Sequence, residues 1–175
     1  MTSRLLSSVL AGGALIGGAW AARAQPAPDI WVKHISSPVA PTRLVPGQRF
    51  TVTVTVENRG TAVAPGSTHQ GYMLDVSFGL RPAGFPARSH VVPVPYRFVE
   101  GMLLKGGRIS NTDDLAPRAS HEYSATVELP PGLKPGKYWV GITADPFNRL
   151  TEPQPYPRGE NDNVNNVEVE IVLPH

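Results

Sequence analysis

Strict alternation of apolar and polar residues constrains the fold of this chain more than any other feature of its sequence. The clearest case is the stretch 49–57, RFTVTVTVE, where a phenylalanine and three valines alternate with three threonines. A period of two with β-branched residues predicts a strand that buries one face and exposes the other. Residues 58–60, NRG, form a turn signal that ends this strand.

The same period recurs along the chain. Further strands are predicted at 29–36, 72–79, 121–129, 137–145 and 167–173. The residues expected to face the core are Phe50, Val52, Val54, Val56, Tyr72, Leu74, Val76, Phe78, Tyr123, Ala125, Val127, Leu129, Tyr138, Val140, Ile142, Ala144, Val167, Val169, Ile171 and Leu173. With 17 glycines and 19 prolines, long helices are disfavoured. Pro46-Gly47 suits the centre of a type II turn. We therefore expect an all-β, antiparallel β-sandwich.

The first 24 residues have the layout of a secretory signal peptide. Arg4 precedes an uncharged, apolar stretch at 5–20, and Ala22-Arg23-Ala24 matches a cleavage site for signal peptidase. The alternative is a retained membrane anchor, but 16 residues are short for a hydrocarbon core about 30 Å thick. We expect a mature domain of residues 25–175, periplasmic or extracellular, with no membrane insertion after cleavage.

The charge balance and the absence of cysteine exclude several functions. Two of the 16 basic residues lie in the signal, which leaves 14 against 14 acidic residues, so no nucleic-acid binding is expected. Without cysteine, thiolate zinc sites and thiol nucleophiles are excluded. The chain has no G-x-S-x-G, no phosphate-binding glycine loop and no local pair of metal-ligating histidines. We expect that the protein is not an enzyme.

Two long connections are candidates for binding. One is an insertion at about 80–114, and the other spans 146–163. In the first, an additional edge strand or hairpin of the sandwich is the favoured interpretation. A partner surface formed by arginines and aromatic residues is the alternative, and the two are compatible. Trp139 faces away from the expected core, where it either covers the sheet under a loop or stacks on a sugar. The partner-binding candidates are Arg88, Tyr96, Arg97, Phe98 and Trp139.

Carboxylates and amides gather around the second connection. Asp145, Glu152, Glu160 and Asp162 are the candidate metal ligands, because calcium prefers six to eight oxygen ligands. The alternative is that these side chains bond the local backbone and shape the turn. No cofactor is otherwise expected. A copper or zinc site assembled in space from the five scattered histidines is a further alternative.

The chain resembles the CARDB family, the cell-adhesion-related domain found in bacteria. The matching pieces, in order over residues 28–173, are Pro28-Asp29-Ile30, Pro46-Gly47-Gln48 before FTVTVTVENRGTA, Leu115-Ala116-Pro117, Pro135-Gly136-Lys137-Tyr138, Ala144-Asp145-Pro146 and the segment 160–166. The resemblance implies an immunoglobulin-like sandwich of about seven strands and a role in adhesion, spacing or binding at the cell envelope. It implies no catalytic residues. Arg118 stands where the family has glycine, so we expect that this turn is not type II.

Three hypotheses for function follow. The first is an exported binding or adhesion module that contacts a protein or an envelope glycan through its long loops. The second is a metal-binding export protein. The third is a structural subunit that self-associates, because residues 80–110 are net basic and residues 152–170 are net acidic.

Overall fold

The computed structural model describes residues 25–39, 42–80, 88–89, 102–152 and 163–174. Within these residues the chain forms nine strands and one short 3-10 helix, which confirms the all-β class. The strands are β1 (Ile30–Ser37), β2 (Thr42–Leu44), β3 (Arg49–Asn58), β4 (Leu74–Leu80), β5 (Arg88–Ser89), β6 (Met102–Ile109), β7 (Ser120–Glu128), β8 (Gly136–Ala144) and β9 (Val164–Ile171). The helix is η1 (Ser67–His69).

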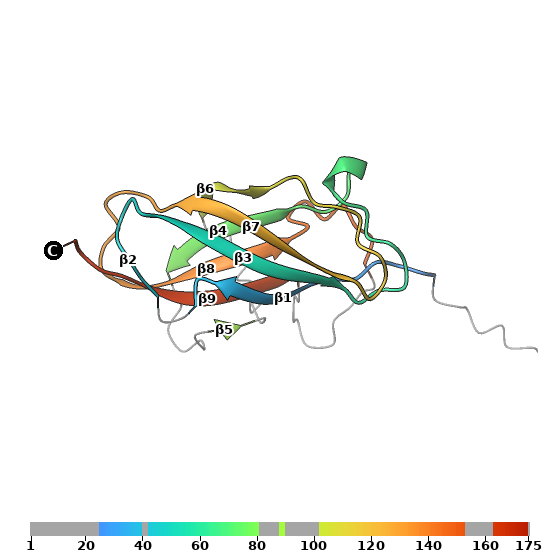
Figure 1. Ribbon diagram of the computed structural model, residues 1–175, viewed down its shortest axis with the longest axis horizontal. Helices are drawn as coiled ribbons and strands as arrows, with labels where there is room; N and C mark the ends of the chain where they lie inside the picture. Colours follow the sequence, from blue (N-terminus) through green and yellow to red (C-terminus); the bar gives the residue numbers. More distant parts are fainter. Residues whose placement is uncertain (1–24, 40–41, 81–87, 90–101, 153–162, 175) are drawn as a thin grey trace, which may run out of the picture.

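The strands form the two layers of a sandwich (Figure 1). One layer is β1-β3-β7, and the other is β6-β4-β8-β9-β2, with β5 also paired to β9. Strand β6 joins the layers, because it pairs with β4 and also meets β7 at the single pair Lys105 and Glu128. Strands β1, β3 and β7 correspond to A, B and E of an immunoglobulin domain, and β4, β8 and β9 to C, F and G.

The alternation of the sequence accounts for the core between the layers. Val52, Val54 and Val56 of β3 are fully buried, and so are most of the other residues expected to face inward. Phe50 and Ala125 are partly buried against the same cluster. Leu173 is the exception, because β9 ends at Ile171 and Leu173 is 60% exposed. The prediction that Leu173 faces the core is wrong.

Strand β6 corrects the predicted insertion at about 80–114. Residues 102–109 belong to the sandwich, with Leu104 and Ile109 buried in the core. The buried positions change phase between Leu104 and Gly107, where the pairing with β4 is also irregular. Because Gly106 has a φ of 78° there, the strand does not keep the simple period of two that marks the others. The alternating residues 92–98 lie outside the described residues.

The first strand of the chain changes layer. Strand β1 runs antiparallel to β3, whereas β2 runs parallel to β9, pairing Thr42–Leu44 with Val169–Ile171. The Ser37–Pro38 peptide bond between them is cis. As Figure 1 shows, the chain enters β1 at one end of the long axis and leaves β9 at the other. None of the described helices is long and apolar enough to cross a membrane.

Two turns test the turn chemistry expected from the sequence. Gly47 has a φ of 78° and Gln48 donates its N–H to the Val45 carbonyl at 3.1 Å, as a type II turn requires. Arg118 has a φ of 67°, and Ala119 donates its N–H to the Ala116 carbonyl at 3.1 Å. With proline at the second position, this turn is also type II, so the expectation for it is wrong.

Hydrogen bonds to β3 explain why Arg118 adopts the left-handed conformation. Its N–H donates to the Asn58 carbonyl at 2.7 Å, and the Asn58 N–H donates to the Ala119 carbonyl at 3.0 Å. These two bonds hold the backbone on both sides of the turn. The arginine therefore adopts a conformation that glycine would adopt with less strain.

Candidate functional site

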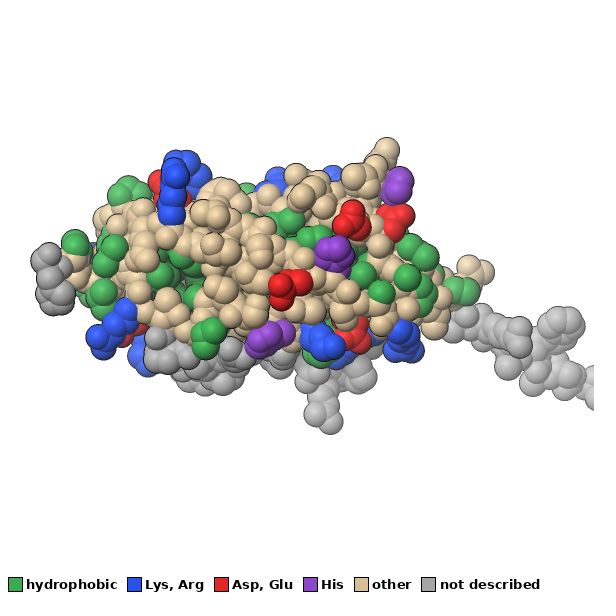
Figure 2. All heavy atoms as spheres, in the orientation of Figure 1, with side chains coloured by type: hydrophobic (Ala, Val, Ile, Leu, Met, Phe, Trp, Pro, Cys, Tyr) green, Lys and Arg blue, Asp and Glu red, His purple; other side chains and the backbone are tan. Residues whose placement is uncertain are grey.

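Several loops meet at one end of the sandwich, which we call the loop end. It comprises residues 27–29, the β3–β4 loop 59–73, the β6–β7 loop 110–119 and the start of the β8–β9 loop at 145–152. Backbone hydrogen bonds join these segments: Arg59 N–H to the Asp29 carbonyl at 2.7 Å, Ala64 with Leu115 in both directions at 2.9 Å, and Asp145 N–H to the Met73 carbonyl at 2.9 Å. The end carries η1 in Figure 1, and acidic and histidine side chains gather toward it in Figure 2.

Asn58, at the end of β3, ties three of these segments together. Its side chain is fully buried. The amide oxygen accepts the N–H groups of Asp29 at 3.1 Å and Gly60 at 2.9 Å. The amide nitrogen donates to the carbonyls of Ala62 at 2.8 Å and Leu115 at 2.9 Å. Two donors and two acceptors use the full hydrogen-bonding capacity of an asparagine amide.

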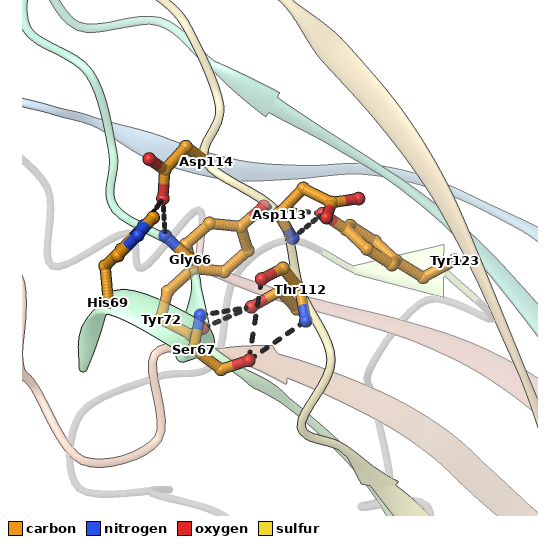
Figure 3. A network of polar contacts seen from close by, with 8 residues as sticks. All are labelled: Gly66, Ser67, His69, Tyr72, Thr112, Asp113, Asp114 and Tyr123. Carbon is orange, nitrogen blue, oxygen red and sulfur yellow. Dashed lines mark hydrogen bonds and ion pairs between the residues drawn. The ribbon is translucent and has the colours of Figure 1, made fainter.

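Ser67 and Thr112 clasp the β3–β4 loop to the β6–β7 loop (Figure 3). The Ser67 N–H donates to Thr112 Oγ1 at 2.9 Å, and the Thr112 N–H donates to Ser67 Oγ at 3.0 Å. The loops approach so closely that a Cβ on Gly66 would lie 2.2 Å from the Thr112 carbonyl oxygen. Glycine at position 66 is therefore needed for space.

A pair of tyrosine hydroxyls lies beneath this clasp. The hydroxyls of Tyr72 and Tyr123 are 2.8 Å apart, and the Asp113 N–H donates to Tyr123 Oη at 3.3 Å. Burial raises the pKa of both tyrosines above the ordinary value, and the hydrogen bond between them raises that of Tyr72 further. Both phenols thus stay protonated at neutral pH, and they act as hydrogen-bonding groups of the scaffold.

Two histidine–aspartate contacts lie on the surface above the tyrosines. His69 Nδ1 is 2.8 Å from Asp114 Oδ1, which also accepts the Gly66 N–H at 2.8 Å. The hydrogen bond and the charge of Asp114 raise the pKa of His69, and the hydrogen bonds from His69 and Gly66 lower the pKa of Asp114. On the other side, His121 Nε2 is 4.0 Å from Asp113 Oδ2. All four side chains are substantially exposed, with Asp113 the most at 71%.

The partners of the two histidines can be compared with those of a catalytic or metal site. In an acyl-transfer triad the imidazole also holds a hydroxyl or thiol nucleophile. Among the described residues, neither His69 nor His121 has a side-chain hydrogen bond to a hydroxyl group. In the same part of the chain, no three histidine, aspartate or glutamate side chains are placed to hold a metal ion. The expectation of a protein without catalytic activity stays a prediction.

The proposed metal ligands Asp145 and Glu152 both lie at the loop end and are largely buried. Glu152 accepts the Ile30 N–H at 2.8 Å and an Asn163 side-chain N–H at 2.6 Å, so it joins β1 to the start of β9. Burial raises the pKa of Glu152, and the charges of Asp29 and Asp145 add to this rise.

Asp145 accepts the Leu150 N–H at 2.8 Å through Oδ2. Its Oδ1 atom is buried and has no hydrogen-bond partner among the described residues. Glu160 and Asp162 lie outside the described residues.

The other binding candidates are only partly placed. Arg88 lies in β5 opposite Val167 of β9, and its side chain is not described. Trp139 is paired with Glu168 across the other edge of β9 and is 5% exposed. This burial is what a tryptophan covering the sheet would have, and binding through it would require that it become exposed. Tyr96, Arg97 and Phe98 lie outside the described residues, so their role stays a prediction.

Of the loop-end residues named here, Asp145 and Glu152 were candidates from the sequence, whereas the two histidine–aspartate contacts were not. The contact between His69 and Asp114 joins residues 45 positions apart, and no local pattern marks such a pair. Asp113 and Asp114 are noticeable as adjacent carboxylates, but on an extended strand they would face opposite ways. In the structure they lie in a loop, so each reaches a different histidine.

These pairings define an immunoglobulin-like β-sandwich whose loops are cross-braced at one end. The CARDB family model matches residues 27–167, and the chain belongs to the CARDB family. A comparison with curated proteins finds no match.

Solved CARDB domains share the fold. The solution structure of a CARDB domain from Pyrococcus furiosus is 21% identical, with a TM-score of 0.52 over 86% of this chain and 100% of that one. A crystal structure of the same domain in complex with di-metal ions gives 20% identity and a TM-score of 0.49 over 83% and 90% of the two chains. A Niemann-Pick type C2 protein from the Japanese carpenter ant gives 10% identity and a TM-score of 0.44, covering 86% of this chain and 96% of that one.

Proposed function

We propose that this CARDB domain is an exported binding module of the bacterial cell envelope, periplasmic or extracellular, that contacts a protein or an envelope glycan through its loop end. The observation that carries the proposal is the combination of exposed polar side chains with a buried support. His69, Asp113 and Asp114 are exposed, while Asn58 and the Ser67–Thr112 clasp beneath them are hydrogen-bonded throughout. A rigid surface loses little conformational entropy when it binds.

The position of these loops on the fold supports the same function. In immunoglobulin variable domains, the loops between strands B and C and between F and G form the antigen-binding end. Here the corresponding loops, β3–β4 and β8–β9, meet at the loop end, where the Asp145 N–H bonds the Met73 carbonyl. Binding residues are commonly displayed on loops that a rigid scaffold positions.

The test compares matched surface changes at the two ends of the mature chain, residues 25–175. Val63 at the loop end and Leu173 at the opposite end are both exposed aliphatic residues, so Val63→Lys and Leu173→Lys make the same chemical change. Each immobilised variant is exposed to solubilised envelope proteins and to purified envelope glycans. We expect V63K alone to lower capture, V63K combined with Asp113→Lys to lower it at least tenfold, and L173K, the match to V63K, to leave it unchanged. Equal loss in both variants, or no capture by the wild-type chain, would contradict the proposal.

The region around Arg88, Tyr96, Arg97 and Phe98 is a second surface to examine in that assay. A deletion there must spare β6, because Leu104 and Ile109 belong to the core. A variant lacking residues 90–101 meets this condition. Loss of capture in this variant, with full capture by the V63K/D113K variant, would move the binding surface to the insertion.

Metal binding is the second candidate function, and one observation favours it. Within the part of the chain that the structure describes, Oδ1 of Asp145 is buried without a hydrogen-bond partner, and a carboxylate oxygen in that state is a suitable ligand for a calcium ion. Calcium binding would raise Tm in millimolar calcium, and Asp145→Asn would remove that increase. An unchanged Tm with calcium, zinc and copper would end this candidate.

Self-association through opposite charges, the third hypothesis, has less support. Lys105 and Arg108 of the basic segment pair with Glu128 and Asp75 within the molecule. Glu168 and Glu170 of the acidic segment pair with Lys137 and Arg43. Charges paired in this way contribute little to contacts between copies. Oligomers that dissociate at high salt, measured by sedimentation, would support the hypothesis.

A further inference from the structure

A tight turn at the loop end holds one aromatic side chain in the solvent. Residues 145–148, DPFN, form a β-turn in which the Asn148 N–H donates to the Asp145 carbonyl at 3.0 Å. Asp145 and Asn148 both have positive φ, of 47° and 52°. Aspartate and asparagine adopt the left-handed region more readily than other residues with a Cβ, so the sequence suits this turn.

The turn is anchored on both sides by hydrogen bonds. The Asp145 N–H bonds the Met73 carbonyl at 2.9 Å, and Asp145 Oδ2 accepts the Leu150 N–H at 2.8 Å. Leu150 itself is buried in the core. Between these anchors, Phe147 is 49% exposed. An aromatic side chain held by a braced turn keeps its position without help from a partner.

Two guanidinium groups flank the Phe147 ring. Cζ of Arg108 lies 4.9 Å from the ring centroid, and Cζ of Arg149 lies 5.1 Å from it. Both distances are within the range of a cation–π interaction. The arrangement brings together residues of β6 and of the β8–β9 loop, which are far apart in sequence.

The two arginines differ in their charge partners. Arg108 forms a two-pronged ion pair with Asp75, with Nε to Oδ1 at 2.9 Å and Nη2 to Oδ2 at 2.8 Å. Arg149 forms no ion pair with a described residue, and its one hydrogen bond there is a long one of 3.5 Å to the Gly71 carbonyl. Beside the exposed ring, the described residues thus provide one guanidinium group neutralised by a carboxylate, that of Arg108, and one without a carboxylate partner, that of Arg149.

We infer that Phe147 and Arg149, with Arg108 held in place by Asp75, form a docking site for an acidic peptide segment that presents a carboxylate beside an apolar side chain. The carboxylate pairs with Arg149, whose planar donors suit a carboxylate, and the apolar side chain packs on Phe147. Aromatic residues and arginine are the side chains that most often dominate binding energy at interfaces. This inference rests on the proposed function and names the partner class of the loop end.

Local charge favours a single carboxylate over a polyanion. Asp75 adjoins Arg108, and Asp113 and Asp114 are exposed on the same end of the molecule. These carboxylates would repel a chain of phosphates, whereas a peptide can place one negative charge at Arg149 and apolar groups elsewhere.

The test uses the mature chain and two peptide-display libraries. One library carries random heptapeptides with a central aromatic residue followed by aspartate or glutamate, and the other replaces the acid with asparagine or glutamine. We expect binders from the acidic library only. Their affinity should fall at least tenfold with Phe147→Ala and with Arg149→Gln, and less with Arg149→Lys, which keeps the charge.

Control variants at the opposite end are Leu173→Ala and Lys134→Gln, both of exposed residues, and they should bind as the wild-type chain does. An unchanged Tm would show that F147A and R149Q are folded. Equal recovery from the two libraries, no recovery from either, or binders indifferent to F147A and R149Q would overturn the inference. If V63K/D113K lowers capture of an envelope partner while F147A and R149Q do not, the proposed function stands and the acidic-peptide site fails.

Discussion

At the scale of single residues, short polar side chains hold the loop end together. Asn58 alone bonds four backbone groups from three segments, and Ser67 and Thr112 bond each other's N–H groups. In loops without regular ladders, buried backbone groups need such partners. Of the exposed side chains above them, Asp114 also contributes to the loop, because it accepts the Gly66 N–H.

Changing Asn58→Asp should lower the free energy of unfolding by about 3 kcal/mol or more. Aspartate keeps the two accepted bonds but cannot donate to the Ala62 and Leu115 carbonyls, and it places a charge in a fully buried site. Urea unfolding measures the loss. Asn111→Asp makes the same change at an exposed position and should be nearly neutral. A small effect at position 58 would mean that water or a shifted loop replaces the network.

The His69–Asp114 pair should depend on pH in a defined way. Asp114 raises the pKa of His69, so the contribution of His69 is complete below the ordinary histidine pKa and lost as pH rises through the higher folded value. His69 and the Gly66 N–H lower the pKa of Asp114, so its contribution is present above the ordinary aspartate pKa and lost as pH falls through the lower folded value. The pair is therefore strongest between about pH 4 and about pH 6.5.

NMR titration of the histidine ring checks this expectation. Asp114→Asn should lower the pKa of His69. The matched change Asp113→Asn, one residue away, should leave it in place, because Asp113 contacts His121 instead. If both variants shift the titration of His69 equally, the general charge of the loop and not the hydrogen bond sets its pKa.

At the scale of elements, the turn before β7 contains a residue in the left-handed backbone conformation, and no glycine in the sequence predicts it. Arg118→Gly should be more stable than Arg118→Ala by about 1 kcal/mol, because only glycine adopts positive φ without a steric penalty. Gly47 allows the opposite change, from glycine to a residue with a Cβ. Its φ is 78°, and nothing lies within 4 Å of a Cβ added there, so only the backbone conformation opposes the change. Gly47→Ala should cost about the same amount, measured by urea unfolding. Equal stability of R118G and R118A would show that the turn rearranges.

Strands with an unbroken period of two could be predicted from the sequence, and so could β1, although its burial pattern is irregular. For β3, β4, β7 and β8, the alternating residues turned out buried because each strand keeps one face on the core. Strand β6 was not predicted because Gly106 and Gly107 interrupt the period of two. Leu173 was assigned to the core because the apolar alternation continues in the sequence beyond Ile171, where β9 ends. The loop end depends on contacts such as Asn58 with Leu115, 57 residues apart, which only the packed sheets bring together.

At the scale of the whole molecule, the expected export signal predicts a processed product. Expression of residues 1–175 in a Gram-negative host should give an exported protein that begins at Gln25, because Ala22 and Ala24 supply the small residues that the peptidase requires. Intact-mass measurement of the periplasmic fraction gives the cleavage position. Replacing both alanines with arginine should leave the precursor uncleaved. Finding the unprocessed wild-type chain in the cytoplasm would count against export.

The change of layer between β1 and β2 has a mechanical consequence. The chain enters at one end of the long axis and leaves at the other, and β2 lies parallel to β9. Tension between the two ends would therefore pull β2 and β9 in opposite directions along their length. A ladder loaded in shear must break its hydrogen bonds together, whereas one loaded at its end opens them one by one. This short pair of strands would oppose the separation of the two ends of the domain.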